Sequence, residues 1–387
     1  MIPYGRQQIS EEDIRAVVEV LRSDFLTQGP QVPLFEQAVS RRCEVGYAVA
    51  VNSATSALHL SCLALGLGPG DLLWTTPITF VASANCALYC GASIDFVDID
   101  QHTCNLSVKA LEHKLRRART DGRLPKVVVV VHLCGLPCDM DAIHALAKEY
   151  RFYVIEDASH AIGSRYQDRP VGDCRYSDIT VFSFHPVKII TSAEGGMALT
   201  NNALLAEKMA LLRSHGITRD PARMTTEPDG PWYYQQVELG FNYRMTDLQA
   251  TLGLSQLNRL DHFIEQRDLQ ARYYDEQLQE LPLKRPESPL GRFSARHLYV
   301  IRLDLETLRI GHLEVFERLR AAGIGVNLHY IPVHLQPYYQ ALGFQAGSFP
   351  VAEDYYRRAI SLPIFPGLTR VEQDRVVRSL REALVCE

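Results

Sequence analysis

The stretch VFSFHPVKIITSAEGG, residues 181–196, begins as a strand and ends in two glycines that lead into a second apolar run at residues 197–199. Three of its first four residues are good β-formers. Lys188 lies among Pro, Val and Ile just past this strand, with Ser183 five residues before it. A lysine in such a position is either a surface residue whose stem covers apolar side chains or a desolvated amine with a chemical role. The neighbouring segments bear on that choice.

Short apolar strands alternate with helices on both sides of this stretch. Continuous apolar strands separated by helices indicate an α/β fold with a mostly parallel sheet that is covered on both faces. Ligands of such sheets bind beyond the carboxyl ends of the strands. The pattern predicts strands at 47–52, 72–76, 94–100, 126–134, 152–157, 178–184 and 196–200, and helices at 53–68, 80–89, 108–118 and 142–151.

The two ends of the chain carry different patterns. Ser10 and Asp13 predict a capped helix with an apolar face at residues 14, 17, 18 and 21, and a second helix is expected near 33–43. After residue 245 we expect a smaller α+β domain, so that residues 1–245 form a large cofactor-binding domain and residues 246–387 a small one. The predicted elements of the small domain are a long linking helix at 246–280, strands at 297–304 and 325–333, and helices at 315–323 and 369–384. Residues 220–236 are rich in turn formers and predict a loop.

Composition excludes several classes of protein. Of 387 residues, 47% are hydrophobic and 22% charged, and the net charge is -5, which is typical of a soluble globular protein and argues against binding to nucleic acid or to a membrane. The N-terminus has no apolar segment typical of a secretory signal, and nine cysteines in a large chain favour a reducing cytoplasm. The pairs Cys86/Cys90 and Cys134/Cys138 leave a zinc site open, but buried thiols are the better interpretation and no metal site is predicted.

Polar residues follow three of the predicted strands, and together they fit one cofactor. A desolvated lysine can form a Schiff base, most often with pyridoxal phosphate. That cofactor also needs a carboxylate at its ring nitrogen, donors for its phosphate and a flat contact for its ring. The residues that could meet these needs are Lys188, Asp157 for the nitrogen, Ala54, Thr55, Ser56 and Ser183 for the phosphate, and Phe80 for the ring.

Each of these residues also has a plain structural interpretation. Ser, Ala and Thr at a helix start are usually a cap, an aspartate after a strand is often a turn residue, and Phe80 alone would be a core residue. The combination, in this order and at successive strand ends, favours the cofactor site.

The chain resembles the DegT/DnrJ/StrS family of sugar aminotransferases, which are fold-type I pyridoxal phosphate enzymes, over nearly its whole length. The matching segments are LTQGP (26–30), VNSATSALHL (51–60), TTPITFVASANC (75–86), FVDID (96–100), VIEDASHAIGS (154–164), FSFHPVKIITSAEGGM (182–197), LRSHGI (212–217), GFNYRMTDLQATLG (240–253) and HYIPVH (329–334).

The resemblance implies roles for individual residues. Lys188 resembles the Schiff-base lysine, which also carries protons, and Asp157 resembles the partner of the ring nitrogen. Ser183, with Ala54 and Thr55, resembles the phosphate site, and His160 lies below the ring where many relatives have glutamine. Asn242, in GFNYR, resembles the asparagine that reaches the cofactor phosphate of a neighbouring subunit. It also lies past a long loop, with no evident route to that site within its own chain. A homodimer with shared active sites is therefore expected.

Within the family, IPYGRQ (2–7) and the segment from 329 to 369 most resemble the enzymes of pseudaminic acid biosynthesis. These take an amino group from L-glutamate to C4 of a UDP-linked 4-keto sugar that is later used to glycosylate flagellin or surface polysaccharide. The resemblance implies sugar-nucleotide contacts by Tyr4, Asp24, Phe25, Leu26, Thr27, Ala54, Ser183, Arg244, Asn327, Leu328, His329 and Tyr330.

Three alternatives remain open from the sequence alone. Residues 327–330 could be a plain strand, the substrate could be another keto sugar, such as a C3-keto or GDP-linked one, and the chain could be a sugar-nucleotide sensor that has lost catalysis. The presence of Lys188, Asp157 and Ser183 argues against the last.

Overall fold

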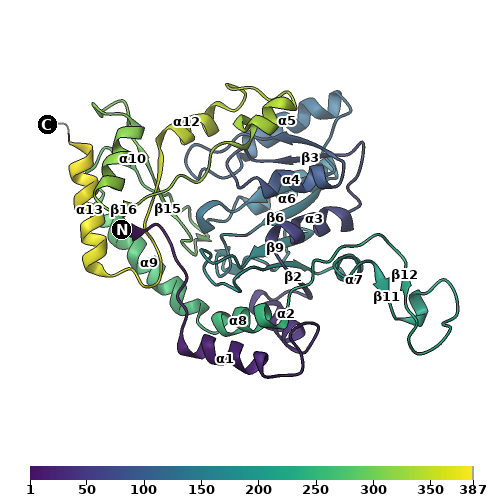
Figure 1. The fold of residues 1–387 in the computed structure, drawn as a ribbon. Coiled ribbons are helices and arrows are strands. Elements are labelled where there is room, and N and C mark those ends of the chain that lie inside the picture. Colours follow the sequence, from purple (N-terminus) through teal and green to yellow (C-terminus); the bar gives the residue numbers. More distant parts are fainter. Residues whose placement is uncertain (386–387) are drawn as a thin grey trace.

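The computed structural model describes residues 1–385, and its centre is one seven-stranded sheet (Figure 1). Six strands run parallel and β10 runs antiparallel to both of its neighbours, β2 and β9. The expected mostly parallel sheet of a fold-type I enzyme is therefore confirmed. In spatial order the strands are β2 (Tyr47–Val51), β10 (Gly196–Thr200), β9 (Ile179–Ser183), β6 (Tyr153–Asp157), β5 (Val127–Val131), β3 (Leu72–Thr75) and β4 (Ser93–Phe96).

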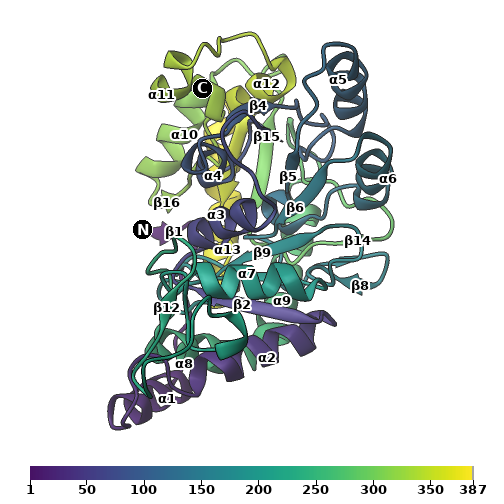
Figure 2. The same ribbon diagram turned by 90° about the vertical axis from the view of Figure 1, so that its right-hand side faces the viewer.

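Helices cover both faces of this sheet because its strands are apolar on both sides. Along β5, Val127 and Val129 pack in the core beneath α3 (Ala54–Ala64), α4 (Ala82–Tyr89) and α7 (Ala203–Leu212). Val128 and Val130 face the opposite way, because successive side chains of a strand alternate between its faces. On that second face lie α5 (Val108–Thr120), α6 (Met140–Tyr150), α2 (Gln31–Cys43) and α8 (Asp247–Leu257) (Figure 2).

The C-terminal part of the chain has its own core and sheet. Strands β13 (Leu283–Lys284), β15 (Tyr299–Leu303) and β17 (Ala359–Leu362) pair antiparallel. The N-terminus joins this part, since β1 (Ile2–Pro3) pairs with β16 (Ile324–Gly325) (Figure 1). The helices here are α9 (Leu260–Gln277), α10 (His312–Ala321), α11 (Pro337–Ala341), α12 (Pro350–Arg358) and α13 (Arg370–Leu384), the last with the expected Thr369/Glu372 capping box.

The remaining elements are short. Strands β7 (Arg165–Tyr166), β8 (Arg169–Pro170) and β14 (Arg292–Phe293) form a small sheet. Between α7 and α8 the chain extends away from the body of the molecule as an arm, which contains β11 (Ile217–Thr218), β12 (Gln235–Gln236) and the exposed Trp232 (Figure 1). The loop expected at 220–236 is thus largely present. Within residues 1–385 no helix is both long and apolar enough to cross a bilayer.

The single helix expected at 246–280 is wrong, because the chain forms α8 and α9 with a break at Asn258 and Arg259. Both backbone N–H groups at the break bond three residues back, to Ser255 and Gln256, which tightens the last turn of α8. α8 packs beside α2 in a core that the first turns of α9 share through Leu260, Phe263 and Ile264. Only the later part of α9 packs in the C-terminal core.

The strand expected at 325–333 is also wrong beyond residue 325. Asn327 bridges to Ser361, and the His329 ring bonds the Ser361 hydroxyl at 2.8 Å, so the segment follows β17 only briefly. Pro332 then removes a backbone donor that a continuing strand would need.

The first helix, α1 (Glu11–Leu21), has the capping box predicted from Ser10 and Asp13. Its expected apolar face is only partly used, because Ile14 and Leu21 are 47% and 56% exposed. The side chains that α1 buries are Asp13 and Val20. The division of the chain at 245/246 stays a prediction.

Candidate active site

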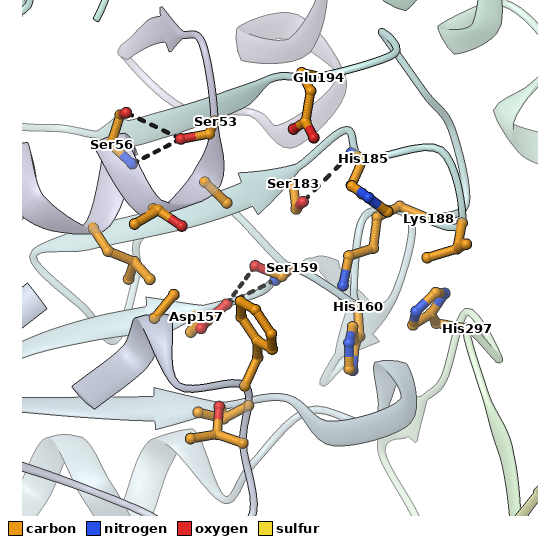
Figure 3. A pocket seen from close by; sticks show the side chains of 18 of the residues that line it. Ser53, Ser56, Asp157, Ser159, His160, Ser183, His185, Lys188, Glu194 and His297 are labelled. Carbon is orange, nitrogen blue, oxygen red and sulfur yellow. Dashed lines mark hydrogen bonds between the residues drawn. The ribbon is translucent and has the colours of Figure 1, made fainter. Parts of the chain in front are cut away.

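A cavity of about 840 Å³ lies at the carboxyl ends of the parallel strands (Figure 3). It opens on the α3 and α4 side of the sheet, and the C-terminal part supplies one wall through His297, His329 and Tyr330. Eleven of the residues proposed from sequence line it together, namely Tyr4, Ala54, Thr55, Ser56, Phe80, Asp157, His160, Ser183, Lys188, His329 and Tyr330.

Lys188 follows β9 on a turn in which its backbone N–H donates to the carbonyl of His185 at 2.9 Å. Its amine points into the cavity between Asp157 and His160 (Figure 3). Burial lowers the pKa of Lys188 from 10.5 to about 8, although the charge of Asp157 acts in the opposite direction. Lys188 is therefore a half-buried, partly desolvated amine in the cavity and not a lysine on the outer surface.

Asp157 is the last residue of β6, and its carboxylate is held on two sides. The Ser83 hydroxyl of α4 donates to Oδ2 at 2.6 Å, and Ser83 is itself hydrogen-bonded to Thr79 at 2.7 Å. Ser159 donates to Oδ1 through both its hydroxyl, at 2.6 Å, and its backbone N–H, at 3.1 Å. These donors orient the carboxylate toward the cavity, where it can hold a protonated nitrogen.

The start of α3 forms an anion site on the cavity wall. Ser53 caps the helix by accepting a hydrogen bond from the backbone N–H of Ser56 at 3.1 Å. The first N–H groups of the helix, those of Ala54 and Thr55, then face the cavity at the positive end of the helix dipole. β10 passes close behind, since a Cβ at Gly196 would lie 2.4 Å from the Ala54 nitrogen. Only glycine allows this approach.

A group of rings lies on the side of the cavity opposite this helix. His160 accepts a hydrogen bond at Nδ1 from the backbone N–H of Cys134 at 3.3 Å, so its Nε2 donates to the Tyr330 hydroxyl at 3.1 Å. The rings of His160 and His297 lie 4.3 Å apart between centroids. Burial lowers the pKa of both imidazoles, so they are neutral near pH 7. Phe80 is 59% exposed at the mouth, 6.3 Å from the Tyr330 ring.

Asn242 and Arg244 do not line this cavity, but they lie beside it. The Asn52 side chain donates to the carbonyl of Asn242 at 3.4 Å, and Asn52 directly precedes the cap of α3. The expectation that this segment has no route to the helix start within its own chain is therefore wrong, because residues 242–244 run alongside the end of β2. The Asn242 side chain itself is exposed.

The other residues proposed for the sugar nucleotide also lie outside the cavity. Asp24, Phe25, Leu26 and Thr27 follow α1 at the far end of the molecule from β4 (Figure 2). Phe25 lines a separate hollow of about 370 Å³ between α1 and α8. Asn327 and Leu328 precede His329, and the Asn327 side chain bonds the Leu328 backbone at 2.8 Å.

Several polar residues of the cavity were missed in the sequence. Ser159 could have been found, since a serine two residues after an aspartate often bonds it locally. Ser83 is the second residue of α4, and His297 comes from the C-terminal part, so neither carries a local signal. Glu194 and Gln249 also line the cavity and were likewise not predicted from the sequence.

Three independent features of the cavity fit pyridoxal phosphate. A buried amine, an oriented carboxylate and a helix N-terminus converge on one cavity from different elements. Within residues 1–385, no group of three or more His, Cys, Asp or Glu side chains is arranged to hold a metal ion.

Comparison with known proteins gives the family. The family model described as DegT/DnrJ/EryC1/StrS aminotransferase matches residues 7–381. The chain is 38% identical over 384 residues to the spore coat polysaccharide biosynthesis protein SpsC of Bacillus subtilis, covering 98% of this chain and 96% of that one. It is 39% identical over 371 residues to the UDP-4-amino-4,6-dideoxy-N-acetyl-beta-L-altrosamine transaminase of Campylobacter jejuni, covering 94% and 92%.

The solved structure of Helicobacter pylori PseC, described as an aminotransferase involved in the biosynthesis of pseudoaminic acid, superposes with a TM-score of 0.90 at 33% identity and covers 99% of both chains. The aminotransferases of this family depend on pyridoxal phosphate, which agrees with the cavity described above. The chain therefore belongs to the DegT/DnrJ/EryC1/StrS aminotransferase family and is a pyridoxal-phosphate-dependent sugar aminotransferase.

Proposed function

We propose that this enzyme transfers the amino group of L-glutamate to C4 of UDP-2-acetamido-2,6-dideoxy-β-L-arabino-hex-4-ulose. The product is UDP-4-amino-4,6-dideoxy-N-acetyl-β-L-altrosamine. The convergence of Lys188, Asp157 and the start of α3 on one cavity carries the chemistry, and the names of the Campylobacter and Helicobacter relatives support this sugar. Cytoplasmic synthesis of a sugar for flagellin glycosylation is part of the proposal.

A second candidate is another nucleotide-linked keto sugar. The chain is as similar to SpsC, a spore coat polysaccharide protein, as to the Campylobacter enzymes, so identity alone does not separate the two substrates. A sugar-nucleotide sensor without activity is disfavoured, because the desolvated Lys188 and the hydrogen-bonded Asp157 would have no use in it.

In the proposed mechanism, the N–H groups at the start of α3 and the Ser183 hydroxyl hold the cofactor phosphate, and Asp157 keeps the ring nitrogen protonated. When bound, the cofactor supplies an electron sink for the carbon that loses its proton. Lys188 anchors the cofactor and, once free, takes the proton from Cα of glutamate. In the second half the same amine delivers a proton to C4 of the sugar. Its pKa near 8 suits an amine that must both take and give a proton near neutral pH.

The walls of the cavity orient the ring and the sugar in this proposal. Phe80 would pack against the cofactor ring, and His160, fixed by its bond to Tyr330, would lie near that ring. Tyr4 and His329 border the space that remains for the sugar, with their rings 5.1 Å apart.

Charge supports a homodimer with shared active sites. UDP and glutamate are both anionic, yet among the described residues that line the cavity Lys188 is the one lysine or arginine. Glu194 adds a negative charge to the wall, and the histidines named above are neutral. We therefore propose that a second copy supplies the cationic side chains, and that Asn242 and Arg244 reach a neighbour's site.

The substrate is tested by product analysis. Purified enzyme is incubated with L-glutamate and a panel of UDP- and GDP-linked 4-keto and 3-keto sugars, and the products are identified by NMR. We expect amination at C4 of the UDP-β-L-arabino 4-keto sugar at the highest kcat/KM, and none with Lys188→Ala. Preference for another keto sugar would reject the substrate while leaving the family chemistry intact.

The shared site is tested by complementation. Lys188→Ala and Asn242→Ala chains are mixed and allowed to exchange subunits. If Asn242 serves the partner's site, both lesions fall in one site of the heterodimer and the other site is intact. About half of the wild-type activity per heterodimer should then return. A confirmed heterodimer that recovers no activity contradicts the proposal.

A further inference from the structure

Strand β6 ends in two consecutive buried carboxylates, Glu156 and Asp157. Asp157 faces the cavity, where it bonds Ser83 of α4. Glu156 must face the other side of the sheet, because neighbouring side chains of a strand alternate, and Val154 two residues earlier packs in the core beneath α5 and α6. Glu156 is 5% exposed and has no part in the mechanism described above. Burying a carboxylate costs free energy unless it is hydrogen-bonded, so the hydrogen-bond partners of Glu156 indicate its role.

The Glu156 carboxylate bonds side chains on or directly after the two neighbouring strands, β9 and β5. It lies 2.7 Å from Nε2 of His132, the residue that follows β5, and 3.0 Å from the Thr180 hydroxyl on β9. The Ser177 hydroxyl donates to it as well. Because the backbone N–H of Cys138 donates to Nδ1 of His132 at 3.1 Å, the imidazole donates to Glu156 through Nε2. Burial alone would raise the pKa of Glu156, but these hydrogen bonds hold it below its usual value.

His132 connects this carboxylate to the cavity. Its backbone N–H donates to the carbonyl of Asp157 at 3.1 Å, while its ring bonds the side chain of Glu156. His132 therefore holds both Glu156 and Asp157 at the end of β6. On the other side, Thr180 lies three residues before Ser183, which lines the cavity. The strands that end in Val131, Asp157 and Ser183 are thus tied together behind the site by a single side chain.

We propose that Glu156 and His132 are positioning residues for transamination. They fix the end of β6 relative to β5 and β9, and so fix Asp157 relative to Lys188 and Ser183. The inference depends on the family's chemistry and not on the identity of the sugar. A misplacement of about 1 Å in a catalytic group can cost roughly 10²-fold in rate, so a small shift at this strand end is enough to matter.

The test is Glu156→Gln in the cofactor-loaded enzyme. Glutamine keeps the shape but turns an amide NH₂ toward one of the donors that the carboxylate now accepts from, either His132 or the hydroxyl pair. We expect kcat to fall by about 10- to 100-fold with KM for both substrates within about twofold of wild type. The visible circular dichroism of the bound cofactor, which depends on how its ring is held, should decrease as well.

The control is Thr200→Val, at the end of β10 away from the cavity. It removes two hydrogen bonds, from the Thr200 hydroxyl to the carbonyl of Asp178 at 2.8 Å and from the backbone N–H of Asn202 to that hydroxyl at 3.1 Å. Neither bond involves a residue of β5 or β6. It should lower the melting temperature but leave kcat and the visible dichroism near wild type. If Thr200→Val lowers kcat as far as Glu156→Gln at equal loss of stability, the proposal is overturned.

His132→Gln provides the second variant, and it is judged by the same criteria if Glu156→Gln does not fold. Where both fold, the double variant should lose little more kcat than the worse single variant, because the two residues act as one unit. Additive losses, or a folded Glu156→Gln enzyme with wild-type kcat and dichroism, would overturn the proposal.

Discussion

Replacing Lys188 with methionine should stabilise the protein from which the cofactor has been removed. In the folded chain the pKa of Lys188 is lowered from 10.5 to about 8 by burial. At pH 7 the folded protein must therefore keep a charged amine in a place that disfavours it. Methionine has a similar length and no charge, so it removes this cost.

The size of the effect follows from the pKa shift. Each unit is worth about 1.4 kcal/mol, so the full shift corresponds to about 3 kcal/mol. The side chain is partly exposed in an open cavity, where water screens it, so we expect a gain of about 1–3 kcal/mol. The pKa of the folded state lies below that of the unfolded state, so the unfolded chain binds this proton more tightly. The cost is complete below about pH 8 and is relieved as the pH rises toward 10.5.

The assay is thermal unfolding of the apo proteins between pH 6 and 10.5. Lys188→Met should melt about 2–4 °C above wild type at pH 7, and the difference should shrink as the pH rises above 8. Lys148→Met, on the exposed side of α6, should show no such pH dependence. A variant that melts at or below the wild-type temperature at pH 7, or a difference that does not change with pH, would refute the reasoning.

Four further changes give distinct outcomes. Asp157→Asn should lower kcat by on the order of 10² or more in steady-state assays, because an amide cannot hold the ring proton. Ser83→Ala removes the 2.6 Å bond to that carboxylate and should cost about tenfold in kcat with the enzyme still folded. Gly196→Ala places a methyl group against the Ala54 nitrogen and should weaken cofactor binding severely, as measured by titration with pyridoxal phosphate. Thr369→Ala should lower the free energy of unfolding by about 1 kcal/mol in denaturant titrations without changing kcat, since only the cap of α13 is lost.

The central sheet could be predicted because its strands are continuous apolar runs with helices between them. The run at 127–131 can only be buried on both faces, and the structure buries every residue of it. The break between α8 and α9 could not be predicted, because residues 258–259 contain no glycine or proline that would mark the end of a helix. The segment after Gly325 follows tertiary bonds such as that from the Tyr355 hydroxyl to the carbonyl of His329, of 2.7 Å.

The same distinction holds for the candidate site. Lys188 and Asp157 could be placed together because Asp157 ends one strand of the parallel sheet and Lys188 lies in the loop after another. The carboxyl ends of such strands share an edge. Ser83 and His297 could not, since each is brought to the cavity by the packing of another element. The expectation that Asn242 has no route to the start of α3 within its own chain is wrong for a related reason. A loop that looks distant in the sequence returns to lie beside β2. The roles of these residues stay predictions.

The cysteines offer a practical route to observing subunit exchange by fluorescence. All eight in the described residues are unpaired thiols, and seven of them are buried, the exception being the half-buried Cys134. Maleimide dyes should therefore react slowly with the folded chain once Cys386, which lies outside the described residues, is replaced by serine. A single cysteine introduced at the exposed Trp232 of the arm would then carry one dye per chain. Donor- and acceptor-labelled batches mixed together would report the assembly and dissociation of oligomers as energy transfer in real time.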